Sequence, residues 1–302
     1  MQIDKCSIAF IGLGEAASAI ISGFGSKRNK QVQAFDIKLQ SNDTREEIIS
    51  RGRMLNICIK LTLDEMIKEA DIIFSTVTAD QAFAVAKDAS SYVKKGAYFF
   101  DLNSCAPSSK QKACKSIHTS GGCYVDVAVM TPVYPKKNLV PLLISGDNSA
   151  QANLILEKIP MNARVIDGPV GRASSIKMVR SIMVKGLEAL TAECALAAVE
   201  ADVLEEVFTS LSEGHPHFDI LTHSIYNFER SLVHGKRRAE ELKEVSKMLE
   251  DLKLINQMSK ATSVWQEKMG SLESKISYSE IKERFYAFAK QVSKELRGTI
   301  DK

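Results

Sequence analysis

The chain has 302 residues, of which 45% are hydrophobic and 25% are charged, and its formal net charge is +3. This length and composition predict a globular protein that buries a sizeable core in two domains. The charge is small and scattered, without a basic block that could follow a phosphate backbone, so we expect no nucleic acid partner.

Further features predict a cytoplasmic protein. No apolar run reaches the length that spans a bilayer, and residues 1–5 lead into the first predicted strand without the apolar region of a signal peptide. The six cysteines contain no Cys-x-x-Cys pair, which fits neither a zinc site nor a disulfide framework. We therefore expect reduced thiols, no membrane and no metal.

Residues 6–36 have the pattern of a dinucleotide-binding unit. The run 6–12 predicts a buried strand, residues 12–17 read Gly-Leu-Gly-Glu-Ala-Ala, and a helical stretch leads to a second strand at 31–36. The first glycine permits a tight turn, the second lets the backbone approach a pyrophosphate, and the last alanine lets the helix lie close to the strand. The helix N-terminus offers N–H groups to phosphate. A plain tight turn is the alternative interpretation. The residues expected to contact the cofactor here are Gly12, Leu13, Gly14, Glu15 and Ala16.

Asp36 predicts which dinucleotide is preferred. It closes the second strand, about 20 residues after the glycines, where a carboxylate accepts hydrogen bonds from the ribose hydroxyls and repels a 2′-phosphate. We therefore expect NAD to be favoured over NADP. Lys38, two residues later, would weaken this preference by attracting a 2′-phosphate.

Strand-like runs alternate with helical stretches as far as residue 168, which predicts a mainly parallel sheet wrapped by helices. The fold class expected is α/β, with a Rossmann domain at 1–168 and an all-α domain at 169–302 for substrate binding and dimerisation. The later strand candidates are 71–77, 97–104, 123–130, 140–146 and 164–168.

Residues 174–202 predict one long helix that is apolar on nearly all sides. Such a helix is buried in a domain core or between subunits, so we expect a homodimer. Amphipathic helices should follow over 204–296, with breaks near Gly214 and Gly270. The charged run 236–253 is expected to be a solvated face.

The long helix carries a polar stripe. Lys177, Ser181, Lys185 and Glu188 follow steps of four, four and three residues, so they share one face. An ion pair between Lys185 and Glu188 would make part of this stripe purely structural, and that alternative stays open. Lys177 begins the stripe near the domain junction, where desolvation would lower the pKa of a lysine and suit it to act as a general base.

Four motifs, in this order and spacing, resemble those of the β-hydroxyacid dehydrogenases, the group of the 3-hydroxyisobutyrate and 6-phosphogluconate dehydrogenases. The resemblance implies a Rossmann domain followed by a helical domain and places Lys177 on the catalytic lysine of the family. It also places Thr76, Val77, Asn103 and Ser104 on the loops that line the cofactor. The motifs are GLGEAA at 12–17, DLNSCAP at 101–107, DVAVMTP at 126–132 and GPVGRASSIKMVRS at 168–181. The later run KMVRSIMVKGLEAL, with HGKRRAEE at 234–241, looks most like a poorly characterised branch with its own helical C-terminal domain.

Departures from the family pattern concern the substrate. Residues 130–132 read Met-Thr-Pro where the family has Ser-Gly-Gly, so a hydroxyl and a backbone donor for the substrate carboxylate are missing. Arg180 offers a planar fork for an acidic group, and Ser181 stands in place of the family's asparagine. Val184 replaces the acid that decarboxylating members use, so we expect oxidation or reduction without decarboxylation. The candidate substrate-binding residues are Met130, Thr131, Arg180, Ser181 and Lys185.

The sequence therefore predicts an NAD-linked dehydrogenase or reductase of a small polar 3-hydroxy acid or its 3-oxo partner. An imine reductase is the first alternative, although retention of Lys177 favours the alcohol–carbonyl pair. A dinucleotide-binding sensor or interaction protein without catalysis is the second, because residues 130–132 are altered.

Histidines supply weaker candidates. His215, His217 and His223 resemble a metal cluster, but Pro216 separates the first two and no carboxylate is suitably spaced, so surface positions are expected instead. His234, with Arg237 and Arg238, would line an anion site or form a solvated basic patch.

Overall fold

The computed structural model describes residues 5–25, 31–214, 219–272, 283 and 285–300. The chain divides into two compact units, Met1–Met178 and Val179–Lys302. The last strand of the first unit ends at Val165, and the division falls inside the long helix α8 (Arg172–Glu200). No helix among the described residues is long and apolar enough to cross a membrane.

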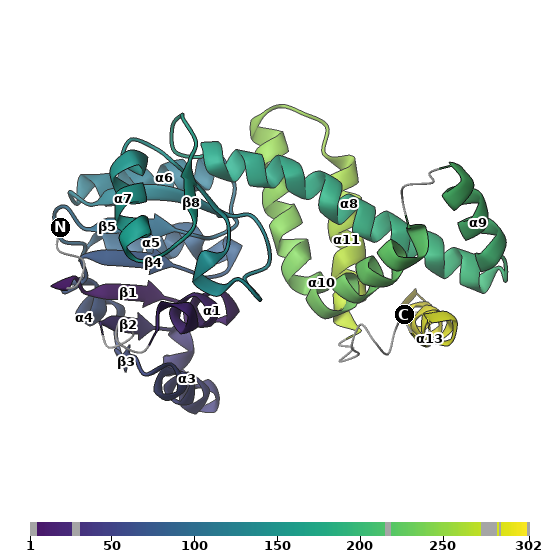
Figure 1. Cartoon of the computed structure of the whole chain (residues 1–302), viewed down its shortest axis with the longest axis horizontal. Coiled ribbons are helices and arrows are strands. Elements are labelled where there is room, and N and C mark those ends of the chain that lie inside the picture. The colour runs from purple at the N-terminus through teal and green to yellow at the C-terminus, as the bar shows by residue number, and fades with distance from the viewer. Residues whose placement is uncertain (1–4, 26–30, 215–218, 273–282, 284, 301–302) are drawn as a thin grey trace. The chain divides into compact units, whose positions relative to one another are not determined.

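The first unit is an α/β domain built on one eight-stranded sheet (Figure 1). Its strand order is β3-β2-β1-β4-β5-β6-β7-β8, and every neighbouring pair is parallel except β6 with β7. The mainly parallel sheet predicted from the sequence is therefore confirmed. The strands are β1 (Ile8–Ile11), β2 (Val32–Phe35), β3 (Cys58–Ile59), β4 (Ile72–Ser75), β5 (Tyr98–Asp101), β6 (Cys123–Val129), β7 (Leu142–Ser145) and β8 (Ala163–Val165). The sequence did not indicate β3, which is only 2 residues long.

Helices pack around this sheet, as parallel strands joined by crossovers require (Figure 1). The α-helices are α1 (Glu15–Phe24), α3 (Asn42–Leu55), α4 (Leu63–Ile67), α5 (Ala82–Ser90), α6 (Pro107–Thr119) and α7 (Ser149–Lys158). The 3₁₀ helices for which the structure gives bounds are η2 (Ile37–Gln40), η3 (Ala79–Gln81) and η4 (Lys137–Leu139). The central strands are buried along their whole length, and Phe10, Phe74 and Phe100 stack across β1, β4 and β5 with ring centroids 4.9 and 5.1 Å apart.

The strand order determines where a ligand can bind. Strand β1 lies between β2 and β4, so the connections that leave β1 and β4 turn to opposite sides of the sheet. A crevice opens beyond the carboxyl ends of strands at such a switch point. The segments that begin there are the turn at Gly12 and the loops that start at Thr76, Leu102 and Met130.

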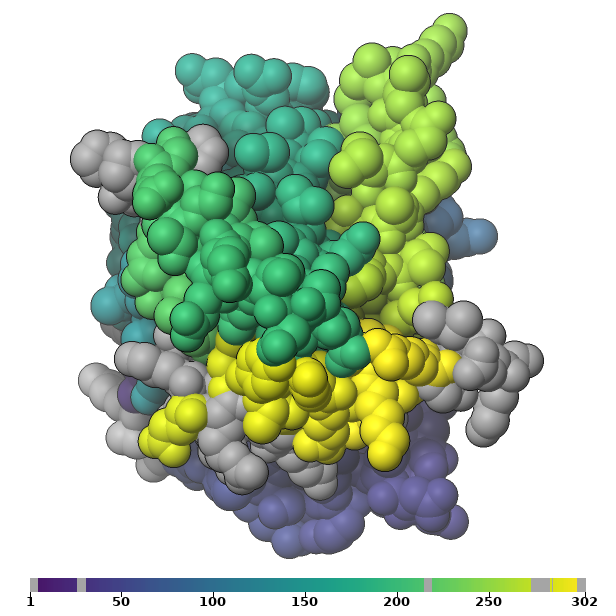
Figure 2. All heavy atoms as spheres, turned by 90° about the vertical axis from the view of Figure 1, so that its right-hand side faces the viewer, coloured from purple at the N-terminus to yellow at the C-terminus, as the bar shows by residue number. Residues whose placement is uncertain are grey.

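All the regular structure described in the second unit is helical. After α8 it contains α9 (Leu204–Gly214), α10 (Ile220–Asp251), α11 (Gln257–Ser271) and α13 (Phe285–Ile300). Its apolar core includes Phe228, whose ring meets the edges of Phe285 and Phe288 at centroid distances of 5.8 and 5.9 Å. Figure 2 shows α13 in yellow beside the green helices of this unit. The predicted long helix and the predicted end near Gly270 are both confirmed.

Helices α10 and α11 cross at two glycines. A Cβ added to Gly235 would lie 2.3 Å from the carbonyl oxygen of Gln266 and 2.6 Å from the backbone nitrogen of Gly270. Only glycine allows backbones to approach this closely. This close approach explains why the motif HGKRRAEE at 234–241 has a glycine as its second residue.

One prediction for this unit is wrong. The charged run 236–253 is not a solvated face throughout, because the Arg238 and Glu241 side chains are buried on α10. Helix α10 is amphipathic and turns these two charged residues toward its neighbours together with Leu242 and Val245. A charged side chain is buried only where it has a partner, and the partners of Arg238 and Glu241 lie about 50 residues earlier in the chain, on α8. The local sequence pattern therefore predicted solvated charges.

Candidate active site

The glycine turn has the geometry that a dinucleotide phosphate requires. Gly12 follows β1 with φ of +88°, and a Cβ there would lie 2.7 Å from the carbonyl oxygen of Thr76. Gly14 precedes α1, and a Cβ added to it would meet nothing within 4 Å. Ala17 is fully buried, as expected where the helix lies close to the sheet. The turn therefore leaves open space at the helix N-terminus, where backbone N–H groups favour an anion.

Asp36 is anchored to the same turn. Its carboxylate accepts hydrogen bonds from the backbone N–H of Leu13 at 2.8 Å and of Lys38 at 3.0 Å. The guanidinium of Arg51 donates to the Leu13 carbonyl oxygen at 2.5 Å and pairs with Glu47 at 2.6 Å. Asp36 and Arg51 are thus both bonded to the backbone of Leu13. Asp36 follows the second strand, where the adenosine ribose is expected.

The loops after β4 and β5 are bonded to each other and to the glycine turn. The Thr76 hydroxyl donates to the Gly12 carbonyl oxygen at 2.9 Å, and the Val77 N–H donates to Asn103 Oδ1 at 2.7 Å. Asn103 is buried, and its Nδ2 donates to Ser75 Oγ at 2.9 Å. The structure therefore brings Thr76, Val77 and Asn103 to one edge of the sheet, with the glycine turn.

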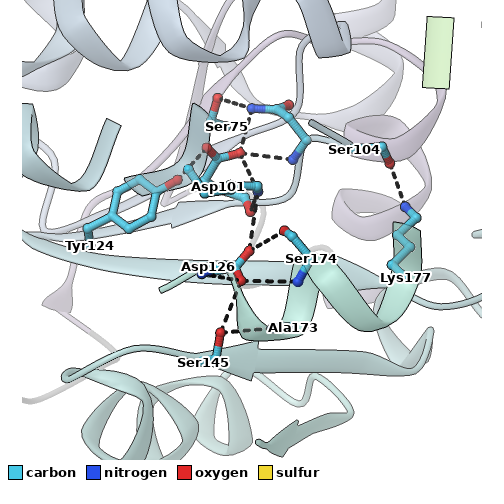
Figure 3. Close-up of polar contacts among 12 residues, drawn as sticks. Ser75, Asp101, Ser104, Tyr124, Asp126, Ser145, Ala173, Ser174 and Lys177 are labelled. Atoms are coloured by element: carbon cyan, nitrogen blue, oxygen red, sulfur yellow. Dashed lines mark hydrogen bonds and ion pairs between the residues drawn. The ribbon is translucent and has the colours of Figure 1, made fainter. Parts of the chain in front are cut away.

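Lys177 reaches this edge from α8. Its Nζ donates to Ser104 Oγ at 2.5 Å, and both side chains are partly buried (Figure 3). Ser104, like Asn103, is one of the residues predicted to line the cofactor, so the predicted catalytic lysine contacts the predicted cofactor loop itself. Figure 3 shows the two side chains pointing toward one another from different elements.

Beneath the loops lies a buried charged cluster, which sequence reasoning missed. Lys110 Nζ lies 2.9 Å from Asp101 Oδ1 and 3.6 Å from Asp126 Oδ1, and the three side chains are at most 1% exposed. Tyr124 donates its hydroxyl to Asp101 Oδ2 at 2.6 Å. Burial, together with the two nearby carboxylates, raises the pKa of Tyr124 well above its usual value, so the phenol remains a donor. Asp101 and Asp126 begin two of the family motifs, at 101–107 and 126–132. Lys110 lies outside these motifs in a polar stretch that is typical of an exposed helix, so the sequence did not indicate it.

The loop after β6 lacks the donors that the family pattern supplies. The Met130 N–H is already bonded to the Pro141 carbonyl oxygen at 2.9 Å, and the Met130 side chain packs against Ala128, Leu143 and Ala173. Thr131 is exposed, and its hydroxyl donates to the next carbonyl oxygen, that of Pro132, at 3.3 Å. The Met130 N–H is therefore already used within the sheet, while the Thr131 side chain stays at the surface.

In the helical unit, Lys185 and Glu188 of the polar stripe face α10. Lys185 Nζ lies 2.8 Å from Glu241 Oε2 and donates to Ser181 Oγ at 3.1 Å, while Glu188 pairs with Arg238. Lys185 and Glu188 thus each pair with a residue of α10, and the alternative in which they pair with each other is not what the structure shows. Burial raises the pKa of Glu188, although the neighbouring cations oppose it.

The other basic side chains that the sequence analysis named in this unit differ in their exposure and partners. Arg180 is exposed on α8, and the exposed Arg237 pairs with Glu241 at 2.8 Å. His234 is half-buried, and burial together with three nearby arginines lowers its pKa to about 4, which keeps the ring neutral at physiological pH. His223 lies exposed on α10. His215 and His217 lie outside the described residues.

The residues present fit a dinucleotide. Open space at Gly14, the helix N-terminus and a carboxylate at the end of β2 are the three parts that the phosphate and the ribose need. A bound nicotinamide would supply hydride transfer.

Comparison with known proteins assigns both parts of the chain. Residues 7–166 match the family described as the NAD binding domain of 6-phosphogluconate dehydrogenase. Residues 198–269 match a domain of unknown function, DUF1932. The β-hydroxyacid dehydrogenase resemblance is thereby confirmed.

Three relatives extend over most of the chain. An uncharacterized 28.5 kDa protein of Methanothermus fervidus is 30% identical over 80% of this chain and 90% of its own length. A conserved hypothetical protein of Sinorhizobium meliloti is 30% identical over 97% of this chain and 99% of that chain, with a TM-score of 0.74. The protein MTH1747, described as structurally similar to 3-hydroxyacid dehydrogenases, is 28% identical over 87% of this chain and 96% of that chain, with a TM-score of 0.65.

More distant structures share the fold alone. They are described as 3-hydroxyisobutyrate dehydrogenases, a reductive aminase and an imine reductase, at 14% to 18% sequence identity.

Proposed function

This chain belongs to the β-hydroxyacid dehydrogenase family, and we propose that it oxidises a small polar 3-hydroxy acid, or reduces the 3-oxo partner, with NAD as the preferred cofactor. One observation carries the proposal: Lys177 Nζ lies 2.5 Å from Ser104 Oγ, at the edge of the sheet that also carries the glycine turn. A proton-transfer group and a dinucleotide-binding turn at one edge suit hydride transfer to or from a carbon that bears a hydroxyl.

Lys177 moves the proton in this proposal. When the alcohol is oxidised, the amine takes the hydroxyl proton while the hydride leaves carbon for the bound nicotinamide; in reduction the ammonium returns the proton to the carbonyl oxygen. Ser104 holds the Lys177 Nζ in position by accepting its hydrogen bond. Val184 offers no acid for a decarboxylation step, so the carbon skeleton stays intact.

Arg180 holds the acidic group of the substrate. It follows Lys177 by three residues on α8 and is exposed, and its fork can form two parallel hydrogen bonds with a carboxylate. The loop after β6 supports this assignment, because the Met130 N–H is already bonded and Thr131 is turned to its own neighbour. Ser181 and Lys185 belong instead to the stripe of Lys177 and are buried, and Lys185 is held by Glu241.

A homodimer would cover an apolar stripe of α8. Val179, Met183, Leu187 and Leu190 follow steps of four, four and three residues, and they are 56%, 64%, 43% and 62% exposed. Four large apolar side chains in a row on one helix are a typical interaction surface. A second copy of the chain would present the same stripe, as a two-fold interface requires.

Replacing Lys177 tests the chemistry. We expect Lys177→Ala to lower kcat by about 10² to 10⁴-fold, the usual contribution of general acid–base catalysis, with NADH affinity unchanged. The assay is turnover of a panel containing 3-hydroxyisobutyrate, 3-hydroxypropionate and L-serine with NAD. Lys177→Arg is the matched control, because it keeps the charge but cannot release a proton, and it should be equally inactive. Near-native turnover in either variant would assign the proton transfer to another group. A parallel assay offers a cyclic imine with NADH. Turnover of the imine without turnover of the three acids would favour an imine reductase, and NADH binding without turnover in either assay would favour a sensor.

Replacing Arg180 tests the substrate class. We expect Arg180→Lys to raise KM for the acid about tenfold, the effect of losing one charge-assisted hydrogen bond of about 1.5 kcal/mol, and to leave NADH affinity and the KM of an uncharged analogue unchanged. Arg237→Lys, at an exposed position of α10, is the control and should leave KM unaltered. If Arg237→Lys alone raises KM, the acid is bound near His234 and Arg237 instead.

Cofactor titration tests the role of Asp36. We expect a lower Kd for NAD than for NADP in the parent protein. Asp36→Asn, which keeps an acceptor for the Leu13 N–H, should narrow the difference about fivefold, because a like-charge repulsion of about 1 kcal/mol is removed. Equal or inverted affinities in the parent would show that Lys38 or Arg51 dominates.

Sedimentation tests the homodimer. We expect the parent to have twice the mass of one chain, and Met183→Glu to shift it toward the monomer by burying a charge in the interface. Leu154→Glu, at a position that is 50% exposed on α7, is the control and should remain dimeric. A monomeric parent, or a Met183→Glu variant that stays dimeric, contradicts this interface.

A further inference from the structure

Two carboxylates of the first unit lie side by side in the interior. Asp101 on β5 and Asp126 on β6 are direct partners in the register of the parallel pair, and both side chains are at most 1% exposed. Two buried acids on adjacent strands repel each other strongly, and both stay ionised only when a cation lies close. A sheet with this register therefore needs a positive group at this point.

Lys110 provides that positive group from the first turn of α6. Its Nζ donates to the Asp101 carbonyl oxygen at 2.6 Å and lies 2.9 Å from Asp101 Oδ1 and 3.6 Å from Asp126 Oδ1. Burial by itself lowers the pKa of Lys110, but Asp101, Cys105 and Asp126 outweigh it and raise the pKa, which keeps the ammonium charged. The lysine thus joins the two carboxylates.

Asp126 in turn holds the beginning of α8. Its carboxylate accepts the backbone N–H of Gly171 at 3.0 Å, the N–H of Ser174 at 3.1 Å and the Ser174 hydroxyl at 2.5 Å. The hydroxyl of Ser145, which donates to Asp126, accepts the N–H of Ala173 at 3.0 Å. These are N–H groups that a helix cannot satisfy within itself, so the acid anchors the first turn of α8. Lys177 lies one turn further along the same helix.

Asp101 holds the partner of Lys177 in the same way. Its Oδ1 accepts the backbone N–H of Asn103 at 3.0 Å and the Asn103 Nδ2 at 2.7 Å. Ser104, the next residue, accepts the hydrogen bond from Lys177. Both ends of the Lys177–Ser104 contact are therefore linked, through the chain at Asn103 and at Ser174, to the two carboxylates that Lys110 joins. Figure 3 shows Asp101 and Asp126 together with Ser104 and Lys177.

We propose that Lys110 is a positioning residue, which sets the place of Lys177 relative to the cofactor loop by holding Asp101 and Asp126 together. The proposal rests on the proposed function in that Lys177 moves the proton. Lys110 itself is not proposed to contact substrate or cofactor, because its side chain is fully buried and lies between Asp101 and Asp126.

Loss of the ammonium would disturb both ends of the contact. Two adjacent buried carboxylates without a cation cannot both remain charged, so one binds a proton or turns away. Either change removes an acceptor from the first turn of α8 or from Asn103. A displacement of about 1 Å at a reacting group costs about 10²-fold in rate.

The test is Lys110→Met in the full chain, because methionine retains much of the volume and removes the charge. We expect kcat on the active acid of the panel to fall by about 10 to 100-fold, while the Kd for NADH changes less than twofold. Amide hydrogen exchange at Gly171, Ala173 and Ser174 should become at least tenfold faster, and exchange in β1 should stay unchanged. Lys112→Met is the matched control, since Lys112 is an exposed residue of the same helix, and it should alter none of these quantities.

A charge-pairing role also predicts non-additive losses. Asp126→Asn removes the second carboxylate, so the loss in kcat of Lys110→Met/Asp126→Asn should be smaller than the product of the two single losses. Additive losses, or a native kcat in Lys110→Met, overturn the proposal. If Lys110→Met does not fold, Ser174→Ala removes one donor to Asp126 and leaves the three charges in place; it should lower kcat in the same sense with NADH affinity retained, and a native kcat overturns the proposal.

Failure of the proposed function can be distinguished from failure of the positioning role of Lys110. If the parent turns over no compound of the panel, the dehydrogenase assignment fails, and positioning is still decided by the acylation rate of Lys177 with acetic anhydride, followed by mass spectrometry. That rate should change at least threefold in Lys110→Met and not in Lys112→Met. An unchanged rate together with unchanged amide exchange overturns the positioning role.

Discussion

The first unit depends on a buried cation between two buried acids. The parallel register of β5 and β6 places Asp101 opposite Asp126, and Lys110 makes that arrangement tolerable. Breaking such a cluster by removing one member leaves an uncompensated charge in the interior, which is far more costly than never having buried it. The same three side chains join β5, β6 and α6 to the start of α8, so one electrostatic constraint serves both the sheet and the helix that carries Lys177.

The topology of the sheet explains why the functional residues converge. Gly12 and Ser104 follow β1 and β5 at the carboxyl edge of the parallel strands, and Lys177, more than a hundred positions after Gly12, reaches the same edge from α8 through its hydrogen bond to Ser104. The loops there are joined by hydrogen bonds that the Thr76 hydroxyl donates and that Asn103 accepts, so the cofactor side of the proposed site is held by backbone and side-chain contacts. Preorganisation of this kind lowers the entropic cost of binding.

The helical unit uses polar contacts for a different purpose. The pairs Lys185 with Glu241 and Glu188 with Arg238 connect α8 to α10, and the hydrogen bond from Asn227 to Thr191 at 2.8 Å continues the same seam. Buried pairs contribute little net stability, because desolvation offsets their attraction, but they disfavour any register in which one charge would be left alone. This unit therefore combines an aromatic core with a polar seam that specifies how its helices align.

The sequence by itself determined the fold class, the glycine turn and the place of Asp36 after the second strand, because these depend on local signals: a continuous apolar strand and glycines at fixed spacing. Lys177 was predicted from the helical period together with the resemblance of residues 168–181 to the family motif. The tertiary structure alone decided which charges are buried together. Lys110 occurs in a stretch that has a surface pattern, and Arg238 and Glu241 occur in a charged run, yet all three are buried. Burial of a charge is allowed only by a partner that the fold brings from a distant segment, and no local pattern records that partner. The same reason applies to Met130, whose N–H is bonded because β6 and β7 run antiparallel, a pairing that the sequence pattern does not specify.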